Sequence, residues 1–242
     1  MSEAIQTQWV IITGAPSSGK TSLLTALESQ GHRTAPEAAR AYFEQKLSSG
    51  STLDELLGWE YSKLGLEINE FEESTRAHLP KDERVFLDRV AAIESLAYAE
   101  VRGAVTNDAL REWPSKYRHH GTVFILDPLP VKKDGIRSED DEQARALDKA
   151  FEKYYKHFGY DVVRVPAYPL DPQEASLERQ IAKSVGQRLD FMLARLEAVA
   201  AVSEAEDAVT KRAALIELQN ASAKGAQAGS RPAGESDQSK AR

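Results

Sequence analysis

A glycine-rich segment near the N-terminus has the composition and spacing of a phosphate-binding loop. Residues 14–21 read GAPSSGKT and fit the pattern G-x-x-x-x-G-K-[ST]. The two glycines let the backbone turn tightly, so that successive N–H groups and a helix N-terminus point at phosphate oxygens. The lysine would add a positive charge at the β- and γ-phosphates, and the threonine hydroxyl would bind Mg²⁺. The predicted nucleotide-binding residues are Gly14, Ala15, Pro16, Ser17, Ser18, Gly19, Lys20, Thr21 and Ser22.

Two apolar segments further along the chain end in aspartate, and either aspartate could supply the acid of a magnesium site. The segment VFLD ends at Asp88, and the segment VFILD ends at Asp127. Asp88 is favoured because Arg89 follows it directly, and an acid beside an arginine can serve a metal and a substrate anion together. Asp127 precedes Pro128-Leu129-Pro130, a rigid turn that is better suited to shaping a pocket. We therefore predict Thr21 and Asp88 as the magnesium-binding residues, with a helix N-cap as the alternative for Asp88.

A third acidic position follows a short, weaker strand that we expect over residues 32–34. Pro36-Glu37-Ala38-Ala39-Arg40 lies at the carboxyl end of that strand, which is the edge where α/β sheets bind ligands. Glu37 could act as general base for an acceptor hydroxyl or as a water-mediated magnesium ligand, and the alternative is an acid favoured by the helix dipole. Arg40 is either a substrate contact or half of a surface ion pair.

A basic segment that contains a glycine precedes a later helix and suits a mobile flap over phosphates. It reads Lys132-Lys133-Asp134-Gly135-Ile136-Arg137. Arg137 could stabilise charge on the transferred group, and Arg145, two turns into the helix, is a weaker candidate. The alternative is a solvated charged loop. The predicted catalytic residues are Lys20, Glu37, Asp88, Arg89 and Arg137.

Short apolar segments alternate with helical patterns and must position these residues. Strands are expected at residues 9–13, 85–87, 123–126 and 162–165, in addition to 32–34. Uninterrupted apolar strands are typical of a sheet that is covered on both faces. Apolar residues three or four apart predict helical structure over 53–71 and 147–158. The alternation predicts an α/β fold, a three-layer P-loop NTPase with a doubly wound parallel sheet of the kinase type.

The pattern becomes wholly helical after Pro172. An apolar stripe runs from Ile181 to Val199, and Ser203-x-x-Glu206 looks like a capping box that opens a further helix to about Leu218. Residues 220–242 contain no Leu, Ile, Val, Phe, Tyr or Trp and are expected to form a disordered tail. The predicted domains are a P-loop core over 1–170 with a lid around 131–146, and a C-terminal helical segment over 171–219 that packs on or extends the core.

Composition argues against several classes of function. The 242 residues carry a net charge of −7, which argues against a nucleic-acid binder but not against a local phosphate site. With no cysteine, the chain has no disulfide, thiolate zinc site or cysteine nucleophile. No secretory signal or membrane-spanning run is visible, so a cytoplasmic protein is expected. The guanine-specifying Asn-Lys-x-Asp motif and the protein-kinase motifs are missing, which disfavours an ordinary GTPase and a protein kinase.

Taken in order, these motifs resemble one branch of P-loop proteins. The pieces are Gly14–Thr21, Pro36-Glu37-Ala38-Ala39-Arg40, Leu87-Asp88-Arg89 with Leu96-Ala97-Tyr98-Ala99, Asp134-Gly135-Ile136-Arg137 and Glu178-Arg179. Over about residues 8 to 197 the chain resembles the NadR/TRPL-defect-type AAA-domain ATPases, which are close to the nucleoside and nucleotide kinases. Members carry a further aspartate on the helix after the Asp-Arg pair, where this chain has Glu94-Ser95. That departure leaves the acceptor open.

The resemblance implies a kinase-like P-loop fold that binds Mg-ATP, with GTP as the other nucleotide to consider, and a ribosylnicotinamide-kinase-like relative. It implies nucleotide contacts for Lys20 and Thr21, acidic site roles for Glu37 and Asp88, and a lid role for Arg137. Only about seven residues precede the first strand, so no nucleotidyltransferase domain is expected ahead of it.

Three functions fit these residues. The first is a small-molecule kinase that transfers the γ-phosphate of ATP to a hydroxyl of a nucleoside-like compound. The second is a nucleotide-hydrolysing switch or binding module, in which the C-terminal helices serve a protein partner or self-association. The third is a P-loop protein that binds nucleotide without activity.

Overall fold

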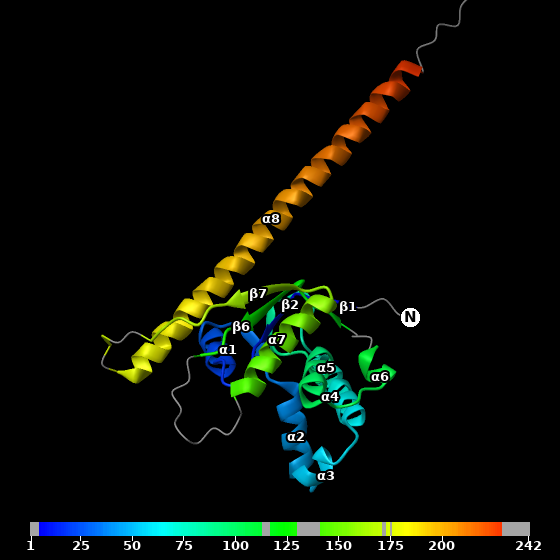
Figure 1. Cartoon of the computed structure of the whole chain (residues 1–242). Coiled ribbons are helices and arrows are strands. Elements are labelled where there is room, and N and C mark those ends of the chain that lie inside the picture. Colours follow the sequence, from blue (N-terminus) through cyan, green and yellow to red (C-terminus); the bar gives the residue numbers. More distant parts are fainter. Residues whose placement is uncertain (1–4, 113–116, 130–140, 171–172, 175, 229–242) are drawn as a thin grey trace, which may run out of the picture. The chain divides into compact units, whose positions relative to one another are not determined.

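The computed structural model describes residues 5–112, 117–129, 141–170, 173–174 and 176–228 (Figure 1). Its centre is a five-stranded parallel sheet in the order β3-β4-β2-β6-β7. The strands are β2 (Trp9–Thr13), β3 (Arg33–Ala35), β4 (Val85–Asp88), β6 (Thr122–Leu126) and β7 (Asp161–Val165). A separate parallel pair is formed by β1 (Ile5–Gln6) and β5 (Tyr117–Arg118). The predicted α/β fold with a parallel sheet is confirmed.

The inner strands are the apolar runs of the sequence. Every residue of β2, β4 and β6 is buried, because helices cover both faces of the sheet. The edge strand β7 is mostly half-buried, and β3 on the other edge is only three residues long. Since β2 is the middle strand, the loop that follows it opens at the centre of the sheet's carboxyl edge.

Eight helices are assigned within the described residues. They are α1 (Lys20–Ser29), α2 (Ala38–Ser48), α3 (Leu53–Leu57), α4 (Tyr61–Arg76), α5 (Ala91–Arg102), α6 (Asp108–Arg111), α7 (Asp141–His157) and α8 (Leu177–Ala228). The helical pattern predicted over 53–71 is divided between α3 and α4. Thr52 and Glu55 form a capping box that starts α3, and Gly58 ends it after five residues. The backbone then leaves the helix before Tyr61, so the periodic pattern spans a break.

The two faces of the sheet carry different helices. Ile11, Val123 and Ile125 pack against α5 and α7 in one hydrophobic cluster, together with Phe151 and Tyr155. These two helices lie side by side (Figure 1). Helix α1 contacts β3 and β4 instead. Right-handed crossovers place α1 on the face opposite α5 and α7, which gives the predicted three layers.

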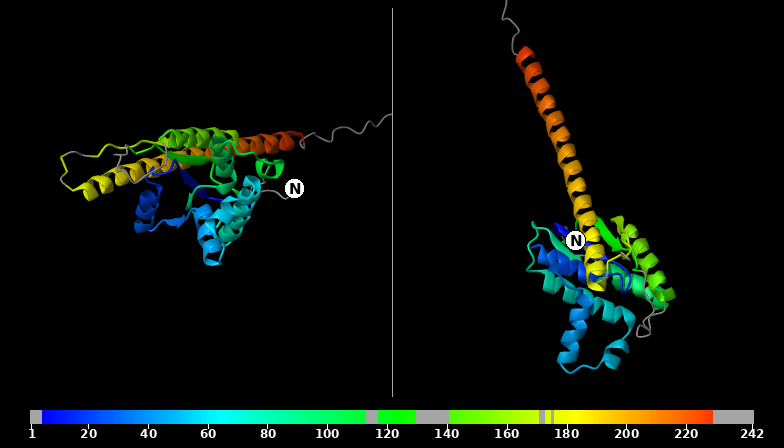
Figure 2. Two further views of the ribbon diagram at one scale, coloured as in Figure 1. Left: turned by 60° about the horizontal axis from the view of Figure 1, so that its bottom comes forward. Right: turned by 90° about the vertical axis from the view of Figure 1, so that its left-hand side faces the viewer.

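The sequence predicted two helices after Pro172, but the structure has a single helix there. Helix α8 runs without interruption from Leu177 to Ala228, so the predicted restart at Ser203 is wrong (Figures 1 and 2). A capping residue begins a helix only where the preceding backbone is not helical, and residues 177–228 contain no proline to end the first one. The disordered tail predicted over 220–242 is also wrong for residues 220–228, which are helical, and its remainder lies outside the described residues.

The chain divides into two compact units, Met1–Met192 and Leu193–Arg242. The first contains the sheet, helices α1 to α7 and the beginning of α8. In the second unit, the described residues form the rest of α8. None of the described helices combines the length and the apolar character needed to cross a bilayer.

Candidate functional site

The predicted phosphate loop connects the end of β2 to the start of α1, as the sequence indicated. Its backbone has positive φ at Gly14 (149°), Ser17 (64°) and Gly19 (90°). A Cβ atom on Gly14 would lie 2.8 Å from the carbonyl oxygen of Leu126 and 2.7 Å from Ser18 Oγ. Gly14 is therefore required by close contact with β6 as well as by its conformation. Ser17 is one of the two described non-glycine residues with positive φ, a strained conformation that is concentrated at functional sites.

Lys20 bends back over the loop. Its side chain is buried, and Nζ donates hydrogen bonds to the carbonyl oxygens of Gly14 (2.8 Å) and Ala15 (3.2 Å). Burial, followed by the nearby charge of Arg89, lowers the pKa of Lys20 to about 8. The lysine thus holds a positive charge in a dry position at the centre of the loop, where phosphate oxygens would offset the cost of burial.

Asp88 is the last residue of β4 and is 7% exposed. Burial raises its pKa to about 6, against the opposing charges of Lys20 and Arg89. Its Oδ1 atom has no hydrogen-bond partner in the described part of the chain, and the Nε atom of Arg89 lies 3.9 Å away. The other candidate, Asp127, accepts a hydrogen bond from Arg164 Nε at 2.8 Å. Asp88 therefore has a buried carboxylate oxygen without a hydrogen-bond partner, whereas Asp127 is paired with Arg164.

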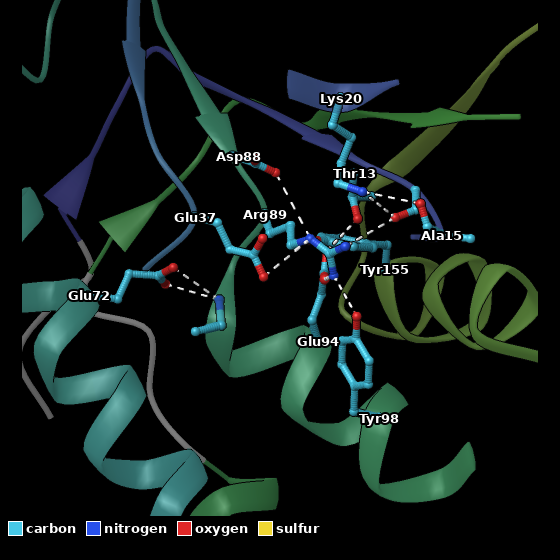
Figure 3. Close-up of polar contacts among 12 residues, drawn as sticks. Thr13, Ala15, Lys20, Glu37, Glu72, Asp88, Arg89, Glu94, Tyr98 and Tyr155 are labelled. Carbon is cyan, nitrogen blue, oxygen red and sulfur yellow. Dashed lines mark hydrogen bonds and ion pairs between the residues drawn. The ribbon is translucent and has the colours of Figure 1, made fainter. Parts of the chain in front are cut away.

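Arg89 connects three elements of the site (Figure 3). Its Nη1 donates to Glu94 (2.6 Å) and to the Tyr98 hydroxyl (3.0 Å) on α5, and its Nη2 donates to the carbonyl oxygen of Gly14 (3.4 Å). Its Nε lies 3.7 Å from Glu37, which precedes α2. Burial is the largest effect and disfavours the charge, but Glu94, Tyr98, Glu37 and Asp88 together outweigh it and raise the pKa of Arg89 well above its ordinary value. Arg89 also has a strained φ of 71°.

Glu94 was not among the predicted catalytic or binding residues, but it lies in the site. Its carboxylate accepts hydrogen bonds from the hydroxyls of Thr13 and Tyr155, in addition to Arg89 (Figure 3). Thr13 directly precedes Gly14, so Glu94 joins α5 and α7 to the start of the phosphate loop. The signal available in the sequence was an acid on the apolar face of a helix, since Glu94 is spaced by three from Ala91 and Ala97, which are both buried.

A buried pair on α4 supports the turn that carries Arg89. Both Glu72 carboxylate oxygens accept the backbone N–H of Ala91, at 3.0 and 3.1 Å, and cap the start of α5. Arg76 lies 3.1 Å from Glu72 and donates to the carbonyl oxygen of Arg89 at 3.0 Å. No sequence pattern indicated this pair, because its partners are 13 to 19 residues away along the chain.

A cavity of about 310 Å³ is lined mainly by residues of α2, α4 and α5, together with Arg89. Glu37, Arg89 and Glu94 form its polar side, and its other walls are largely apolar. The lining includes Phe43, Leu57, Tyr61, Leu64, Ile68 and Tyr98, with Arg40 and Arg102 among the charged residues. The cavity has the size of a small-molecule site.

The remaining predicted residues are placed as follows. Thr21 and Ser22 are exposed in the first turn of α1. Arg40 is exposed and paired with Glu44 at 2.9 Å, which is the surface ion pair considered as its alternative, although it also lines the cavity. Arg137 lies outside the described residues, as does most of the predicted lid, and Arg145 is exposed on α7.

Comparisons with known proteins find solved structures that are similar in fold. Thymidylate kinase from Candida albicans matches with a TM-score of 0.51 and 13% identity, over 80% of this chain and 94% of its own. NadR protein in complex with NR matches with a TM-score of 0.50 and 17% identity, over 75% of this chain and 50% of its own. Deoxyadenosine kinase from M. mycoides with bound dATP matches with a TM-score of 0.48 and 16% identity, over 78% of this chain and 99% of its own.

At these identities the first two structures show the fold alone, which is that of P-loop kinases. A search of curated proteins finds no match. A family model described as an AAA domain matches residues 9–173, which is well over half of the chain and includes the phosphate loop, Glu37, Asp88, Arg89 and Glu94. The resemblance that the motifs indicated is thereby confirmed, and the chain belongs to the AAA domain family of P-loop proteins.

Proposed function

We propose that this protein is a magnesium-dependent kinase that transfers the γ-phosphate of ATP to a hydroxyl group of a small, nucleoside-like molecule. The observation that carries the proposal is the position of the cavity. Glu37 and Arg89 line it, and Arg89 also contacts the carbonyl oxygen of Gly14 in the phosphate loop. A phosphate on the loop and a hydroxyl in the cavity would therefore meet beside the same charged residues.

The loop would bind the triphosphate of ATP, or of GTP, through its backbone N–H groups, the start of α1 and Lys20. Lys20 would exchange its hydrogen bonds to Gly14 and Ala15 for phosphate oxygens. The buried Ser18 Oγ has no hydrogen-bond partner in the described residues and is available to the same group.

The residues present fit a Mg²⁺ ion that is shared with the nucleotide. Among the described residues, no three carboxylate or histidine side chains come together as a metal site. Mg²⁺ bound with nucleotides takes one or two protein oxygens and completes its shell with water and phosphate. The Thr21 hydroxyl and the free Asp88 carboxylate oxygen would supply the protein oxygens. The ion supplies charge neutralisation at the β- and γ-phosphates.

Glu37 would act as the general base. The acceptor oxygen attacks the γ-phosphorus as its proton moves to the Glu37 carboxylate, and the bond to the β–γ bridging oxygen breaks to release ADP. Arg89 would hold the transferred group, and Arg137 would add charge from the lid. The contribution of the protein is positioning and electrostatic stabilisation, as in phosphoryl transfer generally.

Mass spectrometry of products tests the proposal. The protein is incubated with Mg-ATP and a pool of nucleosides and related metabolites, alongside Lys20→Ala. Lys149→Ala, which removes an exposed lysine of α7, is the matched control. We expect a phosphorylated product with the wild type and Lys149→Ala and none with Lys20→Ala. ATP hydrolysis that proceeds equally with and without the pool, and yields no phosphorylated product, would overturn the kinase and leave the hydrolytic switch.

The switch has one observation in its favour. The second unit, from Leu193 onwards, contains a helix longer than the kinase chemistry requires, with Val202 and Val209 exposed two turns apart. Such a helix suits a protein partner or a second copy of the chain. Hydrolysis that depends on this helix would support the switch.

A further inference from the structure

Arg188, on the first part of α8, joins three segments at the carboxyl edge of the sheet. Its Nη1 donates to the carbonyl oxygen of Ser18 in the phosphate loop at 2.6 Å. Its Nη2 donates to the carbonyl oxygen of Asp127 after β6 at 2.8 Å, and its Nε donates to that of Pro166 after β7 at 3.1 Å. The residue is 2% exposed. All three nitrogens of the guanidinium group are therefore used to hold backbone.

Arg188 forms no ion pair with a carboxylate in the described part of the chain, although the charge of Asp127 favours its protonated form. The other two buried arginines of these residues, Arg76 and Arg89, each form an ion pair with a glutamate. The carboxylate of Asp127 is paired with Arg164, and only its backbone oxygen bonds Arg188. Burial lowers the pKa of Arg188, but an arginine stays protonated at neutral pH. A buried cation without a counter-ion is costly, so its position requires a reason.

The bond to Ser18 fixes the direction of one peptide group of the loop. In a trans peptide, the C=O of Ser18 and the N–H of Gly19 point in opposite directions. With its carbonyl oxygen held by Arg188, this peptide has its N–H end turned away from the arginine. A donor on the carbonyl also polarises the amide and makes its N–H a stronger donor.

The packing around Gly19 leaves the peptide little freedom. A Cβ atom on Gly19 would lie 3.3 Å from Leu129 Cδ1 and 3.5 Å from Arg188 Nη1. The loop is thus held from outside by Arg188 and the turn after β6, while Lys20 lies at its centre.

We propose that Arg188 is a positioning residue for nucleotide binding, which orients the Ser18–Gly19 peptide and supplies a fixed positive charge behind the phosphate loop. The inference rests on the proposed nucleotide site, because the phosphates of a bound nucleotide are the anion that would compensate this charge. It assigns the beginning of α8 to the nucleotide site, although it is 170 residues from Ser18 along the chain.

Isothermal titration with Mg-ATP and Mg-ADP tests the inference. The variants are Arg188→Ala and Arg188→Lys, and the matched control is Arg179→Ala, which removes an exposed arginine of the same helix. Each variant is first melted without nucleotide, so that binding is measured well below its Tm. Titrations of Arg188→Ala are repeated with millimolar guanidinium chloride, which can enter the space left by the side chain.

We expect Arg188→Ala to raise the Kd of both nucleotides at least tenfold, and guanidinium to recover at least threefold of the loss. Arg188→Lys should give an intermediate Kd, and Arg179→Ala should bind like the wild type. If Arg188→Ala does not fold, the positioning role is tested by the Kd values of Arg188→Lys for Mg-ATP and Mg-ADP. A Kd within twofold of the wild type in the folded variants, or a loss that guanidinium does not restore, would overturn the positioning role. A wild-type protein that binds neither nucleotide would instead overturn the proposed function.

Discussion

Single side chains decide whether the site does chemistry or only binds. In the proposed mechanism, this difference depends on Glu37. Its carboxylate lies at the cavity, 3.7 Å from Arg89 Nε, and it makes no hydrogen bond to the helix that it precedes. The alternative role for Glu37 was an acid favoured by the helix dipole. Glu37 occupies the N-cap position of α2, but its side chain makes no capping hydrogen bond.

Glu37→Gln separates catalysis from binding. We expect kcat to fall by roughly 10²–10⁴-fold, because the amide cannot accept the proton, while the Kd for Mg-ATP changes less than threefold. Steady-state kinetics and isothermal titration measure the two quantities. Glu44→Gln, which replaces an exposed glutamate on α2, is the control and should leave both unchanged. Loss of ATP affinity in Glu37→Gln would instead assign Glu37 to the metal or to the fold.

We expect His120 to make the folded state less stable at acidic pH. Burial, followed by the charge of Arg84, lowers the pKa of His120. Its Nδ1 accepts the backbone N–H of Thr122 at 3.2 Å, an interaction that a protonated ring cannot make. Because the folded state favours the neutral ring, this contribution to stability is present above pH 6.5 and is lost as the pH falls through the lowered pKa.

The measurement is the Tm of the nucleotide-free protein at pH 7.5 and pH 5. His120→Gln should show a smaller decrease in Tm between the two pH values than the wild type. His78→Gln, which replaces an exposed histidine, is the control and should show the same decrease in Tm as the wild type. An equal decrease in all three proteins would contradict the assignment to His120.

At the scale of elements, the phosphate loop depends on how closely β2 approaches β6. Gly14→Ala would bring Cβ within 2.8 Å of the Leu126 carbonyl oxygen and force a left-handed alanine. We expect a loss of about 2–4 kcal/mol in the free energy of unfolding and loss of ATP binding. Gly31→Ala is the matched control, because Gly31 also has positive φ but its Cβ would meet no atom within 4 Å. Gly31→Ala should lower the free energy of unfolding by only about 1–2 kcal/mol and leave ATP binding intact.

Urea unfolding and titration with Mg-ATP give both quantities for each variant. Equal losses of stability in Gly14→Ala and Gly31→Ala would show that conformation alone, and not the contact with β6, constrains Gly14.

The same scale shows what the sequence can and cannot predict. Strand β2, the phosphate loop and α1 follow each other without a gap, so local patterns were sufficient to predict them. The break between α3 and α4 at Gly58 was not predicted, because the apolar residues on both sides of it keep a helical spacing. Ser203 was predicted as an N-cap because the motif was recognised without regard to the helical residues before it. The structure shows that the helix continues through Ser203. Glu94 and Arg188 could not be assigned, because most of their partners are 61 to 170 residues away along the chain.

At the scale of the whole molecule, the two units predict where the chain can be shortened. The side chains of residues 201–212 are all exposed, whereas Arg188, Leu189 and Met192 are buried. A chain of residues 1–200 should therefore keep the Tm within a few degrees and the Kd for Mg-ATP within twofold. A chain of residues 1–176 loses three large buried apolar side chains, Leu189, Met192 and Leu196, at about 2–5 kcal/mol each, and the contact of Arg188 with the loop. We expect it to lose ATP binding.

Turnover by the shortened chain distinguishes the two functions. The kinase proposed above uses only the loop, the cavity and Arg188, so residues 1–200 should phosphorylate the acceptor at the rate of the full chain. A switch transmits the state of its nucleotide to a partner surface, and removal of residues 201–242 would then change its hydrolysis rate or its oligomeric state. Kinetics and light scattering on both chains, at equal concentration and with saturating Mg-ATP, measure these properties. Unchanged phosphotransfer by residues 1–200 supports the kinase, because a long exposed helix that can be removed without effect takes no part in the reaction.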